Sequence, residues 1–369
     1  METSSRRKFI VKASMASMAS MASVTALGGI KPYLESTLTI SQEKPVPKNR
    51  FTNSSGKSKR DLVMQVLDMT TKPDYIPAGF FMHFGVKGDA AVKAHLEYFR
   101  ATNMDFVKIQ YDEKGLPGND QIKTPKDWAK IPILTEEWFA PHLYLLKEII
   151  KEAKKEALII QTLYGPFMHA KMVVPLNLLL EHIKEDPDSV VRGMENVTLS
   201  LLHFVNAAAR LGVDGFYNCT QGGETNRIPD IPLFNHIVKN YDMVLFKEIS
   251  QLVPCNILHI CDYEGPYQDF SLRFNDYAGE IINIPGAADN KPLSLSTAAE
   301  IFKRPIMGGL DRHGVISTGS TEDVKKATIE LLKDAPANVI LGANCTVDKK
   351  TTPIENIKTA IETAHNFRT

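Results

Sequence analysis

Residues 255–261 read CNILHIC, a short apolar run that holds a histidine and ends in a cysteine. In a β-strand, residues i and i+2 point to the same face, so the imidazole of His259 and the thiol of Cys261 converge on one point. Such a pair supplies half of a metal site. The competing interpretation is that two polarizable side chains fill a core.

Similar short apolar runs alternate with longer helical patterns from Asp61 to the C-terminus. Eight of these runs predict strands, at 78–84, 104–112, 157–164, 213–219, 255–261, 279–285, 304–311 and 337–345. Parallel strands joined by helices in this number predict an α/β fold, a (β/α)8 TIM barrel in a single domain. An open doubly wound sheet is the alternative, but the glycine-rich phosphate motifs that would favour it are missing from the sequence.

The N-terminus differs from the rest of the chain. Residues 1–32 place Arg6 and Arg7 ahead of a weakly apolar stretch without acidic residues, which predicts a twin-arginine export signal and a periplasmic location. A disordered basic N-terminus or a transit peptide is the alternative. Residues 33–59 are rich in Ser, Thr, Pro and Lys and predict a linker, so we expect the barrel to occupy residues 60–369.

The charge balance argues against two classes of partner. The chain has 43 basic and 43 acidic residues, which gives no electrostatic footprint for nucleic acid or for an anionic membrane surface. After the N-terminal segment, no run is long and apolar enough to span a bilayer. We therefore expect neither a nucleic-acid partner nor stable membrane insertion.

Soft metal ligands collect at the predicted strand ends, where a parallel barrel carries its chemistry. One imidazole and two thiolates suit zinc, so His259, Cys261 and Cys345 are the predicted ligand set, with a fourth position open for a substrate thiol. If they bind one ion, their ligand atoms should lie within roughly 5 Å of one another without it. A disulfide, which export would favour, and a set of inert buried thiols remain open alternatives.

Other polar residues near predicted strand ends are candidates for contact with a substrate. His83 and Asp112 lie at the ends of the first and second predicted strands and are candidate catalytic groups, and Asp112 is also a candidate for substrate binding. Tyr164, Glu224 and Asp311 are further candidates for substrate binding. Glu224 could instead be a fourth metal ligand or part of an exposed loop, and Asp311 could simply cap the next helix.

Two motifs resemble a known family. The first is LHIC at 258–261, and the second is GANCTVDKKTTPIENI at 342–357, where a single cysteine stands just ahead of a Thr-Pro-x-Glu-Asn helix start. From about Pro77 to Phe367 the chain resembles the uroporphyrinogen decarboxylase (URO-D) superfamily of (β/α)8 barrels. The His-x-Cys and later Cys are similar to its zinc-dependent methylcobamide:coenzyme M methyltransferase branch.

This resemblance implies a function. It implies a zinc-dependent methyltransferase that moves a methyl group from a corrinoid-type donor to a zinc-activated thiol, with Zn²⁺ on His259, Cys261 and Cys345. The implied partners are a small-molecule thiol, a corrinoid or tetrapyrrole, and a corrinoid protein. Asp105 and Asp112 reproduce an aspartate spacing of the decarboxylase branch, but that branch's paired arginines, tyrosine and histidine have no counterpart. A tetrapyrrole decarboxylase and a non-catalytic tetrapyrrole-binding or corrinoid-binding barrel remain alternatives.

Overall fold

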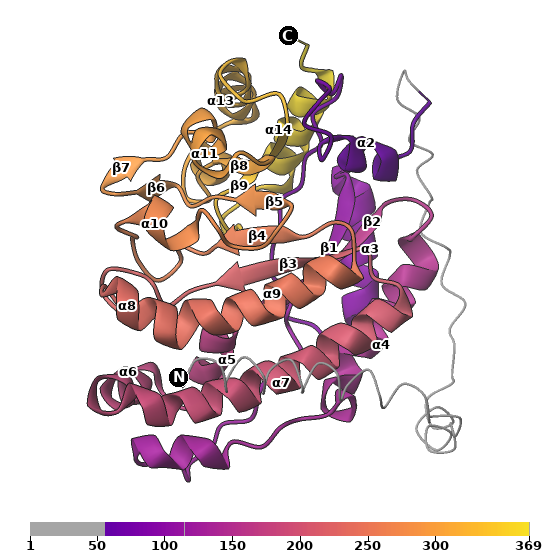
Figure 1. Cartoon of the computed structure of the whole chain (residues 1–369). Helices are drawn as coiled ribbons and strands as arrows, with labels where there is room; N and C mark the ends of the chain where they lie inside the picture. The colour runs from indigo at the N-terminus through magenta and orange to yellow at the C-terminus, as the bar shows by residue number, and fades with distance from the viewer. Residues whose placement is uncertain (1–55, 114, 369) are drawn as a thin grey trace, which may run out of the picture. The chain divides into compact units, whose positions relative to one another are not determined.

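Short runs of Ile, Leu and Val form the strands of one parallel sheet. The computed structural model describes residues 56–113 and 115–368 (Figure 1). Its main sheet has 7 strands in the order β1-β2-β3-β4-β5-β8-β9, and each neighbouring pair is parallel. The strands are β1 Phe106–Ile109, β2 Leu158–Tyr164, β3 Gly215–Thr220, β4 Ile257–Ile260, β5 Ile281–Asn283, β8 Ile306–Leu310 and β9 Val339–Ala343. The predicted α/β class is confirmed, as a curled half-barrel.

The predicted first strand, at 78–84, is not a strand of this sheet. Ala78 forms one isolated parallel bridge to Leu341 of β9. On its other side, the Ala78 carbonyl accepts the N–H of Asp105, which directly precedes β1, at 3.0 Å. The segment therefore lies between the two edge strands of the sheet, where an eighth strand was expected, but the prediction that all of it forms a strand was wrong.

Side chains explain why the ladder stops after this bridge. The hydroxyl of Tyr98 donates to the Phe80 carbonyl at 3.0 Å. The amide of Gln110 donates to the Met82 carbonyl at 2.8 Å. The Phe81 carbonyl between them accepts the backbone N–H of Val347 at 2.8 Å. These three carbonyls are therefore satisfied without a neighbouring strand.

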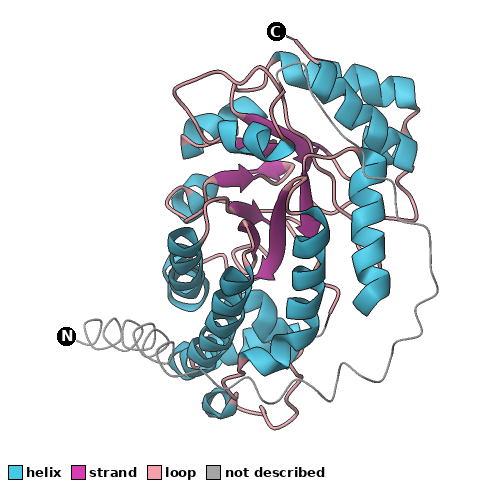
Figure 2. Ribbon diagram, turned by 90° about the vertical axis from the view of Figure 1, so that its right-hand side faces the viewer, coloured by secondary structure: helices cyan, strands magenta, loops and turns pink. Residues whose placement is uncertain are grey.

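Helices lie around the outside of the sheet (Figure 2). The α-helices are α2 Lys59–Gln65, α3 Gly88–Thr102, α4 Ala140–Ala153, α5 Pro166–Val173, α6 Leu176–Glu185, α7 Pro187–Leu211, α8 Ile231–Phe234, α9 Asn240–Leu252, α10 Phe270–Phe274, α11 Leu295–Phe302, α12 Val315–Thr318, α13 Thr321–Lys333 and α14 Ile354–Asn366. The remaining elements are 3-10 helices η2 Pro125–Lys130 and η3 Glu136–Phe139, the π-helix η4 Asn235–Lys239, and the antiparallel pair β6 Ala287–Ala288 and β7 Lys291–Pro292.

Local sequence sets the bounds of the longest described helix, α7. The carboxylate of Asp186 accepts the N–H of Ser189 at the N-terminus, and Pro187 occupies the first turn, where its missing N–H costs nothing. Gly212 ends the helix in the left-handed conformation, with φ 91°. The same helix packs against α9, which in turn lies along β3 (Figure 1).

The inside of the curled sheet is closed at the ends where the strands begin. Phe106, Ile257 and Ile281 are the first residues of their strands, and they belong to one buried cluster that also contains Met307 and Ile340. This packed layer fills that end of the sheet, so no pore runs through it. A pocket is therefore expected at the other end of the sheet, where the strands stop.

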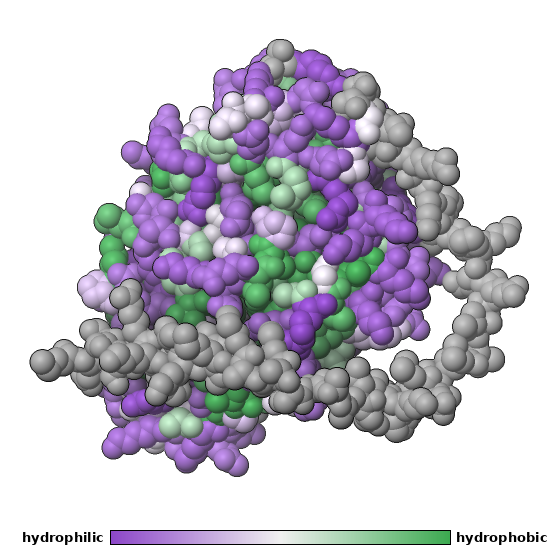
Figure 3. Space-filling model, turned by 45° about the vertical axis from the view of Figure 1, so that its right-hand side comes forward, coloured by the Kyte–Doolittle hydropathy of each residue, from purple (hydrophilic) through white to green (hydrophobic). Residues whose placement is uncertain are grey.

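The predicted export signal at 1–32 and the linker as far as residue 55 lie outside the described residues and stay predictions. The first described helix, α2, begins at Lys59 and is capped by Ser58, next to the predicted start of the barrel. Within the described part, no helix has the length and apolar character needed to cross a membrane. The face drawn in Figure 3 is mostly hydrophilic, with apolar residues in smaller patches between.

Candidate metal centre

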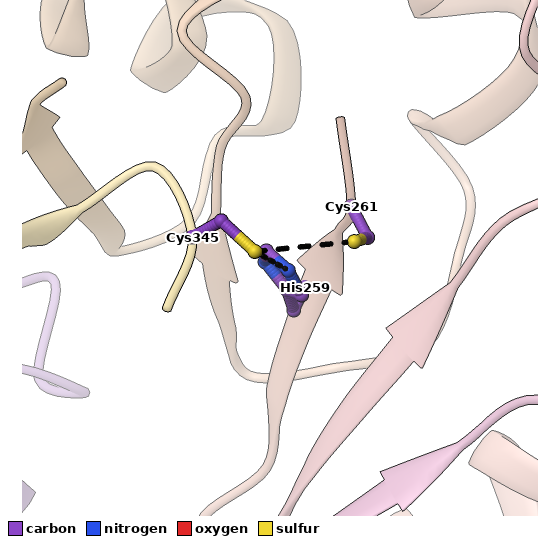
Figure 4. A group of neighbouring side chains, drawn as sticks. All are labelled: His259, Cys261 and Cys345. Atoms are coloured by element: carbon purple, nitrogen blue, oxygen red, sulfur yellow. Dashed lines mark hydrogen bonds between the residues drawn. The ribbon is translucent and has the colours of Figure 1, made fainter. Parts of the chain in front are cut away.

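Three soft ligands meet where two strands end. His259 is on β4 and Cys261 directly follows that strand, while Cys345 lies two residues after β9. His259 Nε2 lies 3.5 Å from Cys345 Sγ, and the two sulfurs are 4.0 Å apart (Figure 4). The ligand atoms of all three residues lie within 4.8 Å of one another, which agrees with the separation expected for a shared ion.

Burial and donor chemistry fit zinc. His259, Cys261 and Cys345 are 2%, 6% and 7% exposed. Thiolates and imidazoles are the donors of protein zinc sites, and three protein ligands leave a fourth position for substrate. The group is the one cluster of potential metal-ligating side chains found in the described part of the chain.

The disulfide alternative does not match this arrangement. A disulfide bond joins sulfurs at about 2.05 Å, whereas Cys261 and Cys345 keep their sulfurs 4.0 Å apart. All four cysteines of the chain are free thiols. Cys255, two residues before β4, is buried and does not line the pocket that the other three cysteines line.

The two thiols of the cluster differ in proton affinity. The hydrogen bond with Cys261 holds the pKa of the Cys345 thiol well below its usual range, and His259 and Arg312 act in the same direction against burial. The same hydrogen bond, together with burial, raises the pKa of Cys261. Cys345 is therefore the thiol poised to be a thiolate, which is the form that binds a soft metal.

The imidazole of His259 has an unmet hydrogen-bonding need. Its ring stacks on Tyr217, with centroids 4.9 Å apart and an interplanar angle of 26°. The Nδ1 atom is buried without a hydrogen-bond partner. A buried polar atom that lacks a partner is costly. Nε2, rather than Nδ1, lies 3.5 Å from Cys345 Sγ and is therefore the candidate ligand atom, so an ion at Nε2 would not satisfy Nδ1.

A network of polar residues fixes the loops that carry the two cysteines. Asp262 follows Cys261, and its carboxylate accepts hydrogen bonds from Arg312 at 2.7 Å and from the Asn344 amide at 2.9 Å. Asn344 precedes Cys345 and also accepts the backbone N–H of Arg312 at 2.9 Å. These hydrogen bonds thus connect the ends of β4, β8 and β9 beside His259, Cys261 and Cys345, the three residues that we call the metal cluster. No sequence pattern indicates this network, because it joins loops that are distant along the chain.

Gln221 contacts the cluster directly. Its amide nitrogen donates to Cys261 Sγ at 3.2 Å. Its amide oxygen accepts hydrogen bonds from Lys171 at 2.8 Å and from Arg227 at 3.3 Å. These cations fix which end of the amide faces the sulfur. The sequence pattern predicted a role for Glu224, three residues later, and not for Gln221.

Glu224 is fully buried and shapes its own loop. Its carboxylate accepts the Gly222 N–H at 2.6 Å and forms an ion pair with Arg227 at 3.2 Å. Burial raises its pKa, against the opposing charge of Arg227. It does not line the pocket described next, so the structure gives it a supporting position in the loop.

A pocket of about 960 Å³ opens beside the metal cluster. His259, Cys261 and Cys345 line it, as do the predicted residues His83 and Tyr164. Its wall also contains Cys219, Tyr217, Lys108, Gln110, Met168, Met172, Tyr263, Arg312 and His313. A substrate in this pocket would meet apolar and aromatic side chains together with several cations.

His83 forms a hydrogen bond through Nδ1 with the Asp112 carboxylate at the mouth of the pocket. The Asp112 carboxylate also accepts the backbone N–H groups of Phe84 at 3.1 Å and Gly85 at 3.5 Å. Burial alone would raise the pKa of Asp112, but His83 and these two N–H groups lower it below its usual value. Asp112 is thus held as a carboxylate that orients His83, and His83 is the member of the pair that lines the pocket.

Tyr164 and Asp311 occupy different positions relative to the pocket. Tyr164 ends β2 and lines the pocket wall, where burial raises its pKa. Asp311 follows β8, is exposed, and accepts the N–H of His313 at 3.0 Å. Of the five predicted substrate-contact residues, the structure places His83 and Tyr164 in the pocket lining, and not Asp112, Glu224 or Asp311.

A solved structure shares the fold of this chain. A methyltransferase from Methanosarcina mazei is 15% identical, with a TM-score of 0.67 over 83% of this chain and 98% of that chain. A B12-independent methionine synthase from Shewanella sp. W3-18-1 is 12% identical, with a TM-score of 0.48 over 79% of this chain and 92% of that chain. At 15% identity the likeness to the methyltransferase concerns the fold alone.

The comparison with protein families is more specific. No curated protein matches the sequence. The model of the family described as uroporphyrinogen decarboxylase (URO-D) matches residues 99–367, which include His259, Cys261 and Cys345. The match extends over more than half of the chain, so the chain belongs to the uroporphyrinogen decarboxylase (URO-D) family.

Proposed function

We propose that this chain is a zinc-dependent methyltransferase that moves a methyl group from a corrinoid-type donor to a thiol. The observation that carries the proposal is the buried convergence of His259, Cys261 and Cys345 within 4.8 Å. The cluster lines a pocket of about 960 Å³, which has room for a small thiol beside part of a larger donor. The similarity in fold to a protein named as a methyltransferase supports this choice within the family.

Zinc held by these three residues would lower the pKa of an acceptor thiol, so that the thiol reacts as a thiolate near neutral pH. That thiolate would attack the methyl carbon of the donor substrate, so that a sulfur–carbon bond would replace the bond between the methyl group and the donor. The bonding electron pair would stay on the donor. The proton of the thiol passes to solvent, so charge and atoms balance.

The chain's own residues orient the reactants. Gln221 and the network around Asp262 and Arg312 hold the two cysteines in place. At the pocket mouth, Asp112 fixes His83 through Nδ1, and this leaves Nε2 for a contact with donor or acceptor. Tyr164 forms part of the wall against which the donor would pack.

Two further parts of the proposal concern architecture and location. The segment at 78–84 takes the place of the eighth strand of a (β/α)8 barrel, since it hydrogen bonds to residues at both edges of the sheet.

The twin-arginine pattern at 1–32 supports export to the periplasm. Changing Arg6 and Arg7 to lysine should leave the protein folded, metal-loaded and in the cytoplasm, and continued export of that double variant would refute the signal.

A tetrapyrrole decarboxylase is the second candidate. The observation that favours it is Asp112, which is held as a carboxylate by His83 and two backbone N–H groups near the pocket mouth. This reaction would need no metal. A third candidate, a barrel that only binds a corrinoid or tetrapyrrole, would need no transfer at all.

Metal analysis of the purified chain, followed by a methyl-transfer assay, distinguishes the three candidates. We expect one zinc per chain, and we expect Cys261→Ala to lose it while Cys255→Ala, a buried cysteine outside the pocket, keeps it. With methylcobalamin and a thiol, the cobalamin spectrum should change from the methylated to the demethylated form. Zinc-free protein that decarboxylates a tetrapyrrole would establish the second candidate, and binding of the corrinoid without demethylation the third.

A further inference from the structure

A buried lysine, Lys108, lies in the pocket beside the metal cluster. Lys108 lies on β1, is 6% exposed, and lines the same pocket as His259, Cys261 and Cys345. Its Nζ donates to the side-chain oxygen of Gln110 at 2.7 Å. No carboxylate among the described residues lies within salt-bridge distance of it. Burying an ammonium group without a carboxylate partner is costly, so this position calls for an explanation.

Two aromatic faces contact the ammonium of Lys108. Its Nζ lies 4.4 Å from the ring centroid of Tyr217 and 4.8 Å from that of Phe81. Cations are attracted to such ring faces, and more strongly when water is excluded. Tyr217 also stacks on His259, so a single ring contacts both the lysine and a metal-ligating candidate. The fold thus places a fixed positive charge one ring away from the metal cluster.

Several titratable groups surround Lys108. They are Asp112, the thiols of Cys219, Cys261 and Cys345, and the imidazole of His95. Burial lowers the pKa of Lys108 to about 8, and the first four groups act against that effect. Burial also lowers the pKa of His95 to about 4, so His95 is neutral at pH 7. Lys108 therefore remains mainly protonated at neutral pH.

Other cations of the pocket already have partners or are exposed. Arg312 pairs with Asp262 at 2.7 Å, and Lys171 pairs with Glu264 at 3.1 Å. Lys349 is exposed at the rim, where its Nζ donates to a backbone carbonyl at 3.4 Å. Lys108 is the buried lysine of this lining, and its charge is not neutralised by a salt bridge.

The charge of the loaded site explains such a lysine. A zinc ion held by two thiolates and a neutral imidazole has no net charge. The thiolate of an acceptor then adds one negative charge in a site that water reaches poorly, where charges interact strongly. We propose that Lys108 is the countercharge of the acceptor thiolate, a positioning residue that favours the ionised form of the bound thiol. This inference rests on the proposed function, because it needs a thiol at the metal.

Proton release on thiol binding tests the role of Lys108. Zinc-loaded protein is mixed with 2-mercaptoethanol in a weakly buffered solution containing a pH indicator, over a range of pH. The readout is the pH at which binding releases half a proton per chain. Lys108→Met keeps the length of the side chain and removes the charge, and we expect it to raise this midpoint by about one pH unit or more, with zinc content unchanged.

Two further variants make the result decisive. Lys349→Met removes a charge from the rim of the same pocket and should leave the midpoint within a few tenths of a unit, because exposed charges are screened. Lys108→Gln provides a second neutral side chain if the methionine variant does not fold. An unchanged midpoint in a folded, zinc-loaded Lys108 variant would overturn the inference, and so would an equal shift in Lys349→Met. A wild-type chain without zinc, or without proton release, would instead overturn the proposed function.

Discussion

Two buried histidine clusters lie at opposite ends of the sheet, and they differ in completeness. At the end where β1 begins, Asp105 accepts hydrogen bonds from the Tyr75 hydroxyl at 2.8 Å and the Ala78 N–H at 2.7 Å, and lies 2.8 Å from His365 Nε2. At the end where β4 stops, His259 keeps a buried Nδ1 without a partner and faces two thiols. The first cluster is complete as it stands, and the second is not.

The difference follows from what each end of a parallel sheet does. The amino-terminal end closes the fold, so its polar groups are paired within the protein, and His365 ties helix α14 to the start of β1. The carboxyl end holds the pocket, so its ligands are held close together but left partly unsatisfied. We call the first the Asp105 clamp, formed by Tyr75, Asp105 and His365, and keep the name metal cluster for His259, Cys261 and Cys345.

The largest expected effect separates the two histidines. His259→Ala should weaken zinc binding by at least a factor of about 1000, roughly 4 kcal/mol, because one of three ligands is removed. His365→Ala should leave zinc affinity unchanged, since the Asp105 clamp is at the other end of the sheet. Competition with a chromophoric chelator measures both values. Full zinc affinity in the folded His259 variant would refute the metal cluster.

The Asp105 clamp should matter for stability instead. Asp105→Asn removes the charge that faces His365 and places an amide where the Ala78 N–H needs an acceptor, so we expect a loss of about 3 kcal/mol in the free energy of unfolding. Urea denaturation monitored by circular dichroism measures it. Zinc content per folded chain should not change. A loss below about 1 kcal/mol would show that the clamp is not a structural element.

Zinc itself should stabilise the chain by mass action. At a free zinc concentration 100 times the dissociation constant, the free energy of unfolding should rise by about 2.7 kcal/mol. A chelator should reverse the gain, and the His259→Ala variant should show none of it. An equal gain in that variant would mean that zinc binds elsewhere.

A smaller effect is expected from the network that supports the cysteines. Asp262→Asn weakens the contacts with Arg312 and Asn344 without touching a ligand, and should reduce zinc affinity by roughly tenfold, about 1.4 kcal/mol. Asp311→Asn, at an exposed position in a neighbouring loop, is the matched control and should have no effect. If both variants bind zinc like the wild type, the network does not hold the ligands.

Local sequence was enough to predict much of the fold. Seven apolar runs became strands because each buries its side chains on both faces, as parallel strands do. The run at 78–84 looked the same but stopped pairing after Ala78, because Tyr98 and Gln110 hydrogen bond to its carbonyls. Contacts of that kind depend on which helix and strand lie next to the segment, and the sequence pattern does not contain them.

The residues of the candidate site were likewise predicted only in part. His259 and Cys261 were found because two residues on one strand carry the signal, and Cys345 because it follows a strand and matches a family motif. Gln221 and Lys108 were missed. A glutamine in a loop and a lysine in an apolar strand gain meaning only when the fold brings them to a sulfur or between two aromatic rings.

X-ray absorption at the zinc edge tests the central claim most directly. The measurement uses the wild-type chain, purified and loaded with one equivalent of zinc. The account predicts two sulfur ligands at about 2.3 Å and one imidazole nitrogen at about 2.0 Å from the zinc ion. The fourth ligand should be an oxygen or nitrogen atom, and a third sulfur should replace it when a thiol is added. A zinc ion with only oxygen and nitrogen ligands, or a spectrum that does not respond to thiol, would contradict it.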